Sequence, residues 1–306
     1  MLDLSGKVAV VTGAGNGIGE GISLVLARAG ADVLSSDISA ERAERTAEQL
    51  RGIGRRSVSS QVDVRDRDAL AAVAETAVAE FGSLDICVAN AGISRRSRLL
   101  TMTEEEWDDQ INVNQKGVFL TVQTCARQMV RRNRGGRVIT ISSIAARRAP
   151  VDRFAYAASK AAVHVMTRSW AQELAPFGIT VNSIGPGIIE TPLSRLDSTT
   201  DGFSELERGI PAGRVGQPAD IGKLACWLAS DEAAYVTGTY NVVDCGITDM
   251  AGYLMHGDYD RSVRDLAANR QLSETGSGAE ILAVLDERAA SDRDRDVEWR
   301  AETGLK

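Results

Sequence analysis

Residues 7–19 read KVAVVTGAGNGIG, and the rest of the fold can be inferred outward from this stretch. The apolar run at residues 8–11 is typical of a buried β-strand, and the glycines after it break the strand. An apolar-periodic helix follows, through Ile22, Leu26 and Ala29. In this order, strand, glycine loop and helix let a phosphate group approach the backbone and the N–H groups of a helix N-terminus. For the glycines taken alone, a plain tight turn is the alternative.

A second candidate strand, residues 31–36, ends at Asp37, about 20 residues beyond the glycine loop. A carboxylate at this place accepts hydrogen bonds from the ribose hydroxyls of NAD and repels the 2′-phosphate of NADP. Asn16 in the loop is neutral, whereas a basic residue there would favour NADP. Both features predict NAD, or NADH in the reductive direction, rather than NADP. The alternative for Asp37 is a strand-end turn or a helix N-cap before Glu41.

Strand-like and helix-like segments continue to alternate along the chain. Helices are expected at residues 41–51, 66–81 and 103–128, and strands at 57–62 and 84–89. Thr103 and Glu106 form a capping box that marks the start of the third of these helices. This alternation predicts an α/β fold with a Rossmann-type, doubly wound parallel sheet and helices on both faces. Because such sheets bind ligands at the carboxyl ends of their strands, the strand tips are the candidate site.

Composition restricts the partners of this 306-residue chain. Its net charge of −7 and pI near 5.1 argue against nucleic acid. Four scattered cysteines and a strand that begins almost at the N-terminus predict a reduced, cytoplasmic chain without a targeting segment. Two histidines and no ligand-spaced cysteines argue against a metal centre. No apolar run has the length that a membrane span requires.

Three side chains with reactive groups fall between residues 143 and 160. Ser143 follows the apolar run at 138–141, whereas Tyr156 and Lys160 share one face of a helix expected to run to about Ala175. A strand tip facing that helix would bring a hydroxyl, a phenol and an ammonium onto one reacting atom.

This combination suits the oxidation of an alcohol, in which a proton leaves the hydroxyl as a hydride leaves carbon. A free phenol is a poor base at neutral pH, and the Lys160 ammonium should lower the pKa of Tyr156. Tyr156 then serves as base in oxidation and as acid in reduction. Ser143 can donate to the substrate oxygen, and Lys160 can also hold the nicotinamide ribose.

Together these motifs resemble the short-chain dehydrogenase/reductase family. Residues 12–19 resemble its TGxxxGxG loop, 90–92 its NAG motif, 182–187 its N-x-x-x-PG turn, and Tyr156 with Lys160 its YxxxK motif. The resemblance covers roughly residues 4 to 248. The chain departs from the family at Cys245, where a glycine is usual, and in an unusual extension after the usual end.

The resemblance implies catalytic roles for Ser143, Tyr156, Lys160 and Asn114, with Asn114 anchoring a water that relays protons to Lys160. Asp63 is expected near the adenine and Thr191 near the nicotinamide carboxamide. The expected cofactor-binding residues are Gly13, Asn16, Gly17, Ile18, Gly19, Asp37, Asp63, Val64, Asn90, Ala91, Gly92, Tyr156, Lys160, Pro186, Gly187, Ile189 and Thr191.

The substrate side is less constrained. The candidate substrate-binding residues are Ser94, Ala145, Arg147, Arg153 and Gly187. Arginines are dense here, which suggests either an anionic substrate or a solvated rim, and we favour the rim. They are Arg95, Arg96, Arg98, Arg147, Arg148 and Arg153. The polar segment 191–214 is expected to cover the substrate as a lid. His164 is expected to serve packing or an interface.

The chain is therefore predicted to have a dehydrogenase domain at residues 1–249 and a helical extension at 250–306 that packs on a neighbouring subunit. Relatives usually form tetramers, so a homotetramer, or else a dimer, is expected.

The predicted function is NAD-dependent interconversion of a secondary alcohol and a ketone, on a sugar or polyol, a cyclic alcohol or a hydroxy acid. A 3-oxoacyl-thioester reductase is one alternative, against which Asp37 counts because such reductases generally use NADPH. A non-catalytic nicotinamide-binding sensor or scaffold is the other, against which the complete Ser–Tyr–Lys–Asn set counts.

Overall fold

The computed structural model describes residues 2–148, 150, 152–192, 207 and 210–250. The proposed extension, apart from Met250, and most of the proposed lid lie outside these residues. Within the described part of the chain, no helix is both long and apolar enough to cross a bilayer.

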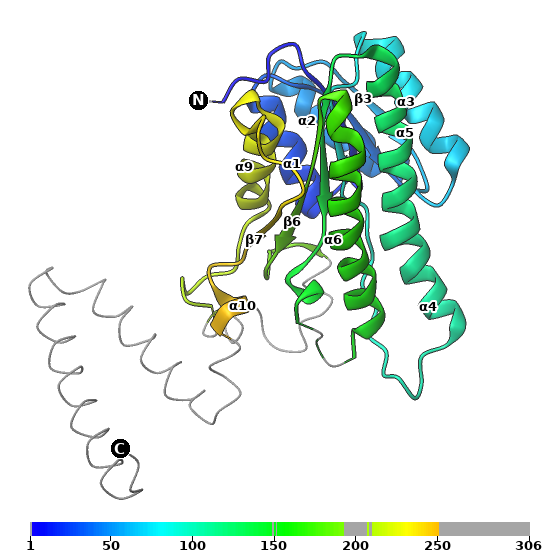
Figure 1. Cartoon of the computed structure of the whole chain (residues 1–306), viewed down its shortest axis with the longest axis vertical. Coiled ribbons are helices and arrows are strands. Elements are labelled where there is room, and N and C mark those ends of the chain that lie inside the picture. The colour runs from blue at the N-terminus through cyan, green and yellow to red at the C-terminus, as the bar shows by residue number, and fades with distance from the viewer. Residues whose placement is uncertain (1, 149, 151, 193–206, 208–209, 251–306) are drawn as a thin grey trace, which may run out of the picture.

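A seven-stranded parallel sheet with the order β3-β2-β1-β4-β5-β6-β7 forms the centre of the molecule (Figure 1). This confirms the predicted doubly wound fold. The strands are β1 Val8–Thr12, β2 Asp32–Asp37, β3 Ser57–Gln61, β4 Ile86–Ala89, β5 Gly136–Ile141, β6 Ile179–Pro186 and β7 Tyr240–Val243.

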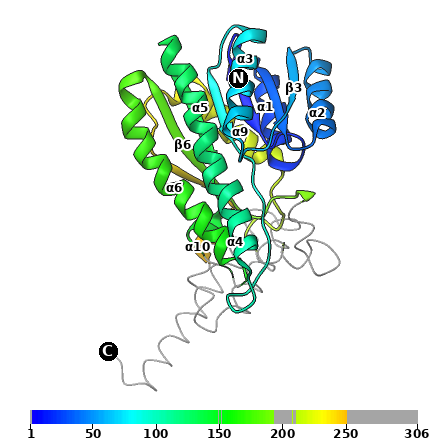
Figure 2. The ribbon, with the colours of Figure 1, turned by 90° about the vertical axis from the view of Figure 1, so that its right-hand side faces the viewer.

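Helices cover both faces of the sheet, with α1 and α9 on one face and α5 and α6 on the other (Figures 1 and 2). The helices are α1 Gly17–Arg28, α2 Ala40–Gly52, α3 Arg67–Phe81, α4 Glu104–Ile111, α5 Gly117–Arg132, α6 Phe154–Leu174, α9 Pro218–Ala229 and the short α10 Ile247–Met250. Helices α4 and α5 are joined by a π turn, Asn112–Lys116, where one continuous helix was expected.

Alternate residues of each strand divide between two cores. Val8 and Val10 of β1 pack with α3, α5 and α6, whereas Ala9 and Val11 pack with α1, α2 and α9. Because both faces of the sheet are buried, the strands read as continuous apolar runs rather than alternating ones. This arrangement sets all seven strand ends of the same polarity along one edge.

Candidate active site

The glycine loop lies between β1 and α1 and is held close to the tip of β4. Gly13 has φ of 63°, and a Cβ placed there would come within 2.8 Å of the Ala91 Cα. Asn90 fixes the loop by donating from Nδ2 to the carbonyl oxygens of Thr12 and Gly13, at 2.9 and 3.1 Å. Helix α1 starts with Asn16 as its N-cap residue, whose side chain makes no capping hydrogen bond. The Asn16 side chain thus leaves the N-terminus of α1 without a side-chain cap.

Asp37 ends β2 beside this loop and is buried, with 6% of its surface exposed. One carboxylate oxygen accepts from the Gly15 N–H at 3.1 Å, and the other accepts from the Ser39 N–H at 2.9 Å. The Arg42 guanidinium also donates to Asp37, from Nη2 at 2.9 Å. Ser39, not Asp37, caps α2 by accepting from the Arg42 N–H. The helix-cap alternative for Asp37 is therefore wrong.

The tips of β3 and β4 follow along the same edge. At the end of β3, Asp63 is paired with Arg65 Nη2 at 2.7 Å, and these hydrogen bonds lower the pKa of Asp63. Val64 is buried against Gly117, where an added Cβ would come within 2.6 Å of a Val64 methyl group. The contact between Val64 and Gly117 places the end of β3 against the start of α5.

Asn114 lies in the π turn and is fully buried. Its Oδ1 accepts from the Ile93 N–H at 2.8 Å, and its Nδ2 donates to the Ile93 carbonyl at 2.8 Å and to Ser159 Oγ at 3.2 Å. The amide therefore ties the helix to the loop after β4 and to α6. A π turn often marks a functional site because it reorients one side chain within a helix.

Ser143 follows β5 and precedes a 3₁₀ turn, Ile144–Ala146. Its Oγ accepts from the Ala145 N–H at 3.1 Å. Its carbonyl accepts from the Ala146 N–H at 2.9 Å. The preceding Ser142 instead donates to the Lys160 carbonyl at 2.8 Å, so its hydroxyl hydrogen is already engaged. Of the two serines, Ser143 therefore remains the candidate for chemistry.

Tyr156 and Lys160 lie on the same face of α6, as their spacing predicted. The Lys160 Nζ is 5.8 Å from the centroid of the Tyr156 ring and donates to the Ile141 carbonyl at 2.9 Å. Lys160 is 3% exposed, and this burial lowers its pKa to about 8. Gly92 lies beside it, since a Cβ there would come within 3.3 Å of Nζ and 3.1 Å of Asn114 Oδ1. The structure thus brings Gly92, Asn114 and Lys160 together.

The turn after β6 returns the chain to the glycine loop. Gly187 donates its N–H to the Val243 carbonyl at 2.9 Å, directly after Pro186 ends the strand. Ile189 is buried and forms a bridge with Gly216. Thr191 then lies against the loop, with a methyl group 3.2 Å from where a Cβ on Gly17 would be. The turn and the glycine loop therefore border the same space.

The candidate substrate-binding residues lie in different surroundings. Ala145 is buried, and Arg153 lies at the start of α6. The Ser94 hydroxyl is buried and makes no hydrogen bond to the described residues. The Arg147 guanidinium lies 4.8 Å from the centroid of the Tyr240 ring. Arg147 therefore contacts an aromatic ring of the protein itself.

Other arginines of the expected rim are also engaged. Arg95 pairs with Asp109 at 3.0 Å, Arg96 contacts Asp152 at 3.7 Å, and Arg148 donates to the Ile247 carbonyl at 3.0 Å. These contacts favour the rim interpretation over an anionic substrate.

Two contributors to this region escaped sequence reasoning. Arg42 pairs with Asp37, five residues earlier, and the start of α2 after Ser39 was the available signal. Tyr240 donates from its hydroxyl to the Ser143 carbonyl at 2.6 Å, across 97 positions of sequence. The contact between Tyr240 and Ser143 could be predicted only from the pairing register of β6 and β7, and the sequence alone does not give this register.

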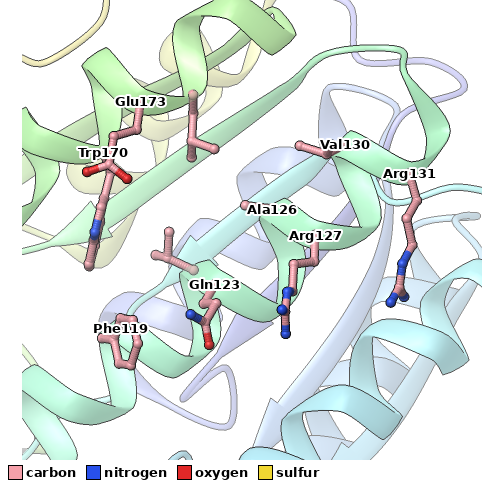
Figure 3. Close-up of a pocket in the computed structure, with 10 residues that line it drawn as sticks. Phe119, Gln123, Ala126, Arg127, Val130, Arg131, Trp170 and Glu173 are labelled. Carbon is pink, nitrogen blue, oxygen red and sulfur yellow. The ribbon is translucent and has the colours of Figure 1, made fainter.

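A separate hollow of about 500 Å³ lies between α5 and α6, lined by residues of these two helices (Figure 3). Phe119 and Val122 of α5 and Trp170 and Leu174 of α6 line its apolar part, and Arg127 and Glu173 lie at its edge. None of the predicted site residues lines it.

The residues at the strand tips fit a nicotinamide dinucleotide. The glycine loop leaves a cradle that side chains would fill: a Cβ on Gly15 would lie 2.8 Å from the Asp37 carboxylate. The helix N-terminus suits the pyrophosphate, and the buried Asp37 suits a ribose diol. Lys160 and the turn at Gly187 border the opposite end of the same edge.

Comparison with known proteins gives the same assignment. A family model described as Enoyl-(Acyl carrier protein) reductase matches residues 13–248. The 3-oxoacyl-[acyl-carrier-protein] reductase FabG of Thermotoga maritima is 40% identical over 244 residues, covering 80% of this chain and 98% of that protein.

Solved structures are similar over the same part of the chain. A short-chain type dehydrogenase/reductase from Mycobacterium marinum has a TM-score of 0.77 and 38% identity, covering 80% of this chain and 97% of that one. Carveol dehydrogenase from Mycobacterium avium, in complex with NAD, has a TM-score of 0.76 and 32% identity, covering 81% and 99%. With the strand-tip geometry, these likenesses show that the chain belongs to the short-chain dehydrogenase/reductase family, NAD(P)-dependent oxidoreductases that act on CH–OH groups.

Proposed function

We propose that this enzyme interconverts a secondary alcohol and a ketone, prefers NAD, and uses Tyr156 as acid and base. The observation that carries the proposal is the buried Lys160 ammonium, 5.8 Å from the centroid of the Tyr156 ring. A positive charge held in a poorly solvated place stabilises a nearby phenolate more strongly than it would in water. Family membership as a CH–OH oxidoreductase sets aside the sensor alternative.

In this proposal each of the chain's own groups has one task. Tyr156 takes the hydroxyl proton of the alcohol, or returns it to the ketone. Ser143 uses its Oγ as acceptor for the Ala145 N–H, which leaves the hydroxyl hydrogen to donate to the substrate oxygen. Asn114 and Lys160 lie beside Gly92 and suit the water-mediated proton relay that the family resemblance implies. A bound nicotinamide dinucleotide supplies the hydride acceptor in oxidation and the hydride donor in reduction.

The preference for NAD rests on Asp37. Its buried carboxylate already accepts hydrogen bonds from the Gly15 and Ser39 N–H groups, so it is fixed in place beside the glycine loop. Arg42 partly balances its charge, but Arg42 is held in the ion pair and not presented to a 2′-phosphate. Carveol dehydrogenase, bound to NAD, is a relative with this cofactor. The other cofactor contacts expected at the strand tips, including those of Ile18, Gly19 and Asp63, belong to the same proposal.

The test is a panel of carveol, cyclohexanol, D-sorbitol and 3-hydroxybutyrate with NAD, followed by NADH absorbance, with NADP in parallel. We expect turnover with at least one alcohol. We also expect Tyr156→Phe to lower kcat by at least 100-fold while NADH binding, followed by fluorescence, is retained. Retained turnover in Tyr156→Phe would contradict the proposed role, and a preference for NADP would contradict the reading of Asp37.

A second candidate function is reduction of a 3-oxoacyl thioester on an acidic carrier protein. It is favoured by the 40% identity to a 3-oxoacyl-[acyl-carrier-protein] reductase. Arg131 and Arg132 at the end of α5 carry the positive charge that such a carrier would meet. Acetoacetyl-CoA with NADH and NADPH is the discriminating substrate, and Asp37 predicts that NADPH would serve poorly.

We also propose that the enzyme is a homotetramer, or else a dimer, joined in part through the hollow between α5 and α6. Phe119, Val122, Trp170 and Leu174 give this face apolar area, while Arg127 and Glu173 offer opposite charges to a second copy (Figure 3). Residues 250–306 form a separate extension to the domain of residues 1–249 in this proposal, and pack on a neighbouring subunit. Light scattering measures the mass of the assembly that the whole chain forms. The same measurement on a chain ending at residue 249 shows how much the extension adds to association through the hollow.

A cytoplasmic location stays a prediction. The free thiols of Cys87, Cys125 and Cys226 are buried, which is compatible with a reducing compartment.

A further inference from the structure

Tyr240, the first residue of β7, reaches the site from the edge of the sheet. Its hydroxyl donates to the Ser143 carbonyl at 2.6 Å. Its ring stacks on His164 of α6, with centroids 4.4 Å apart and planes inclined by 17°. The Arg147 guanidinium lies 4.8 Å from the centroid of the same ring. A single side chain therefore connects β7, α6 and the turn that carries Ser143.

The space for this ring is made by a glycine. A Cβ on Gly185 of β6 would clash with the Tyr240 hydroxyl and ring carbons. In the sheet, Tyr240 pairs with Ser183, two residues before Gly185, so the ring leans along β6 toward the strand tip. Gly185 thus lets the phenol cross its neighbouring strand and arrive at Ser143.

Ser143 is held by three donors. Its carbonyl accepts from the Ala146 N–H at 2.9 Å and from Tyr240, which occupies both lone pairs of that oxygen. Its Oγ accepts from the Ala145 N–H at 3.1 Å. The carbonyl contacts fix the backbone of Ser143, and the contact to Oγ selects the rotation of the hydroxyl. Removal of the Tyr240 hydroxyl would leave this carbonyl, within the described part of the chain, with the Ala146 N–H of the 3₁₀ turn alone.

We propose that Tyr240 is a positioning residue for the reaction: it holds the Ser143 backbone so that the serine hydroxyl points at the substrate oxygen. The inference rests on Ser143 acting as proposed above. His164 and Arg147 hold the Tyr240 ring from the helix and from the turn, so both side chains contribute through Tyr240 and need no contact with the substrate.

The stack suits this role at neutral pH. Burial, followed by the positive charges of Arg147 and Arg168, lowers the pKa of His164. His164 is therefore neutral at pH 7 and stacks on Tyr240 without adding charge beside Arg147. Burial also raises the pKa of Tyr240, which keeps its hydroxyl protonated and able to donate.

The test compares Tyr240→Phe with Tyr235→Phe. The control makes the same chemical change on a fully exposed side chain shortly before the same strand. Loss of a hydrogen bond worth about 1 kcal/mol predicts about a 5-fold loss of kcat for Tyr240→Phe with the best alcohol of the panel. NADH affinity should stay unchanged. The amides of Ala145 and Ala146 should exchange with deuterium faster in Tyr240→Phe and as in wild type in Tyr235→Phe.

A double-mutant cycle with Ser143→Ala separates positioning from general support of the fold. If Tyr240 acts through the serine hydroxyl, Tyr240→Phe should lower kcat little further in the Ser143→Ala background. Equal losses in both backgrounds, or unchanged exchange at Ala145 and Ala146, would overturn the inference. A kcat of Ser143→Ala equal to that of the wild type would instead overturn the proposed role of Ser143. If Ser143→Ala lowers kcat and Tyr240→Phe does not, only the positioning role of Tyr240 would be overturned.

Discussion

Replacing Lys160 with methionine should stabilise the folded protein at neutral pH while removing its activity. Lys160 is 3% exposed, and burial lowers its pKa from 10.5 to about 8. A buried group whose charged form is disfavoured lowers stability wherever the unfolded chain would carry that charge. Methionine keeps most of the aliphatic stem and removes the ammonium, so this destabilisation should disappear.

The magnitude follows from the change in pKa. A difference of roughly 2.5 units between the unfolded and the folded chain corresponds to about 3 kcal/mol, at 1.36 kcal/mol per unit. Losing the hydrogen bond from Nζ to the Ile141 carbonyl costs about 1 kcal/mol. The net expectation for Lys160→Met is therefore a gain of about 2 kcal/mol in the free energy of unfolding at pH 7.

The stability of the wild type should depend on pH with a definite sign. Below about pH 8 both states of the wild type are protonated and the whole penalty is present. Above it the folded state releases its proton first, so wild-type stability rises with pH until the unfolded value of 10.5. The advantage of Lys160→Met should thus shrink by about 2 kcal/mol between pH 7 and 9.5.

Urea denaturation at pH 7 and 9.5 measures this, with Lys223→Met as the control. The Lys223 side chain is 72% exposed, so its replacement should change stability by less than about 0.5 kcal/mol at either pH. An advantage of Lys160→Met that is the same at both pH values, or a variant less stable than wild type at pH 7, would refute the reasoning.

The cofactor pocket and the end of the sheet give two further predictions. Asp37→Ser should release Arg42, now 2.9 Å from the carboxylate, to meet a 2′-phosphate; kcat/KM with NADP should rise at least 10-fold, and adding Arg42→Ala should abolish the gain. A gain that survives Arg42→Ala would argue against this reasoning. Cys245 has φ of 53°, where a Cβ is strained, so Cys245→Gly should raise the free energy of unfolding by about 1 kcal/mol. Cys245→Ala keeps the Cβ and should bring no such gain, which a thermal unfolding series would show.

Much of the fold follows from local sequence because the sheet is buried on both faces. The run at residues 8–11 and the glycines after it gave β1, the loop and α1 within a residue or so. Tyr156 and Lys160 were placed on one face by helical periodicity alone. The capping box of Thr103 and Glu106 likewise marked the start of α4. In each case the partners are close in sequence, so spacing sets the geometry.

The contacts that sequence reasoning missed depend on distant elements. Tyr240 meets Ser143 because β7 pairs with β6 in one register, and because Gly185 leaves room for the ring. The arginine cluster left two interpretations open in the sequence. The favoured one, a solvated rim, agrees with the ion pairs that Arg95 and Arg96 make with Asp109 and Asp152. Charge density along a chain does not show where the opposing charges lie.

The π turn at Asn112–Lys116 shows how a buried polar side chain overrides helical periodicity. A regular helix would have continued the capped pattern from Thr103, and asparagine is a poor residue within it. The extra residue of the turn changes the direction of Asn114, whose amide then satisfies both backbone groups of Ile93 and reaches Ser159. Three hydrogen bonds in a fully buried place offset the irregular turn. The loop after β4 is held through Ile93, so the amide that lies in the π turn also fixes Gly92 beside Lys160.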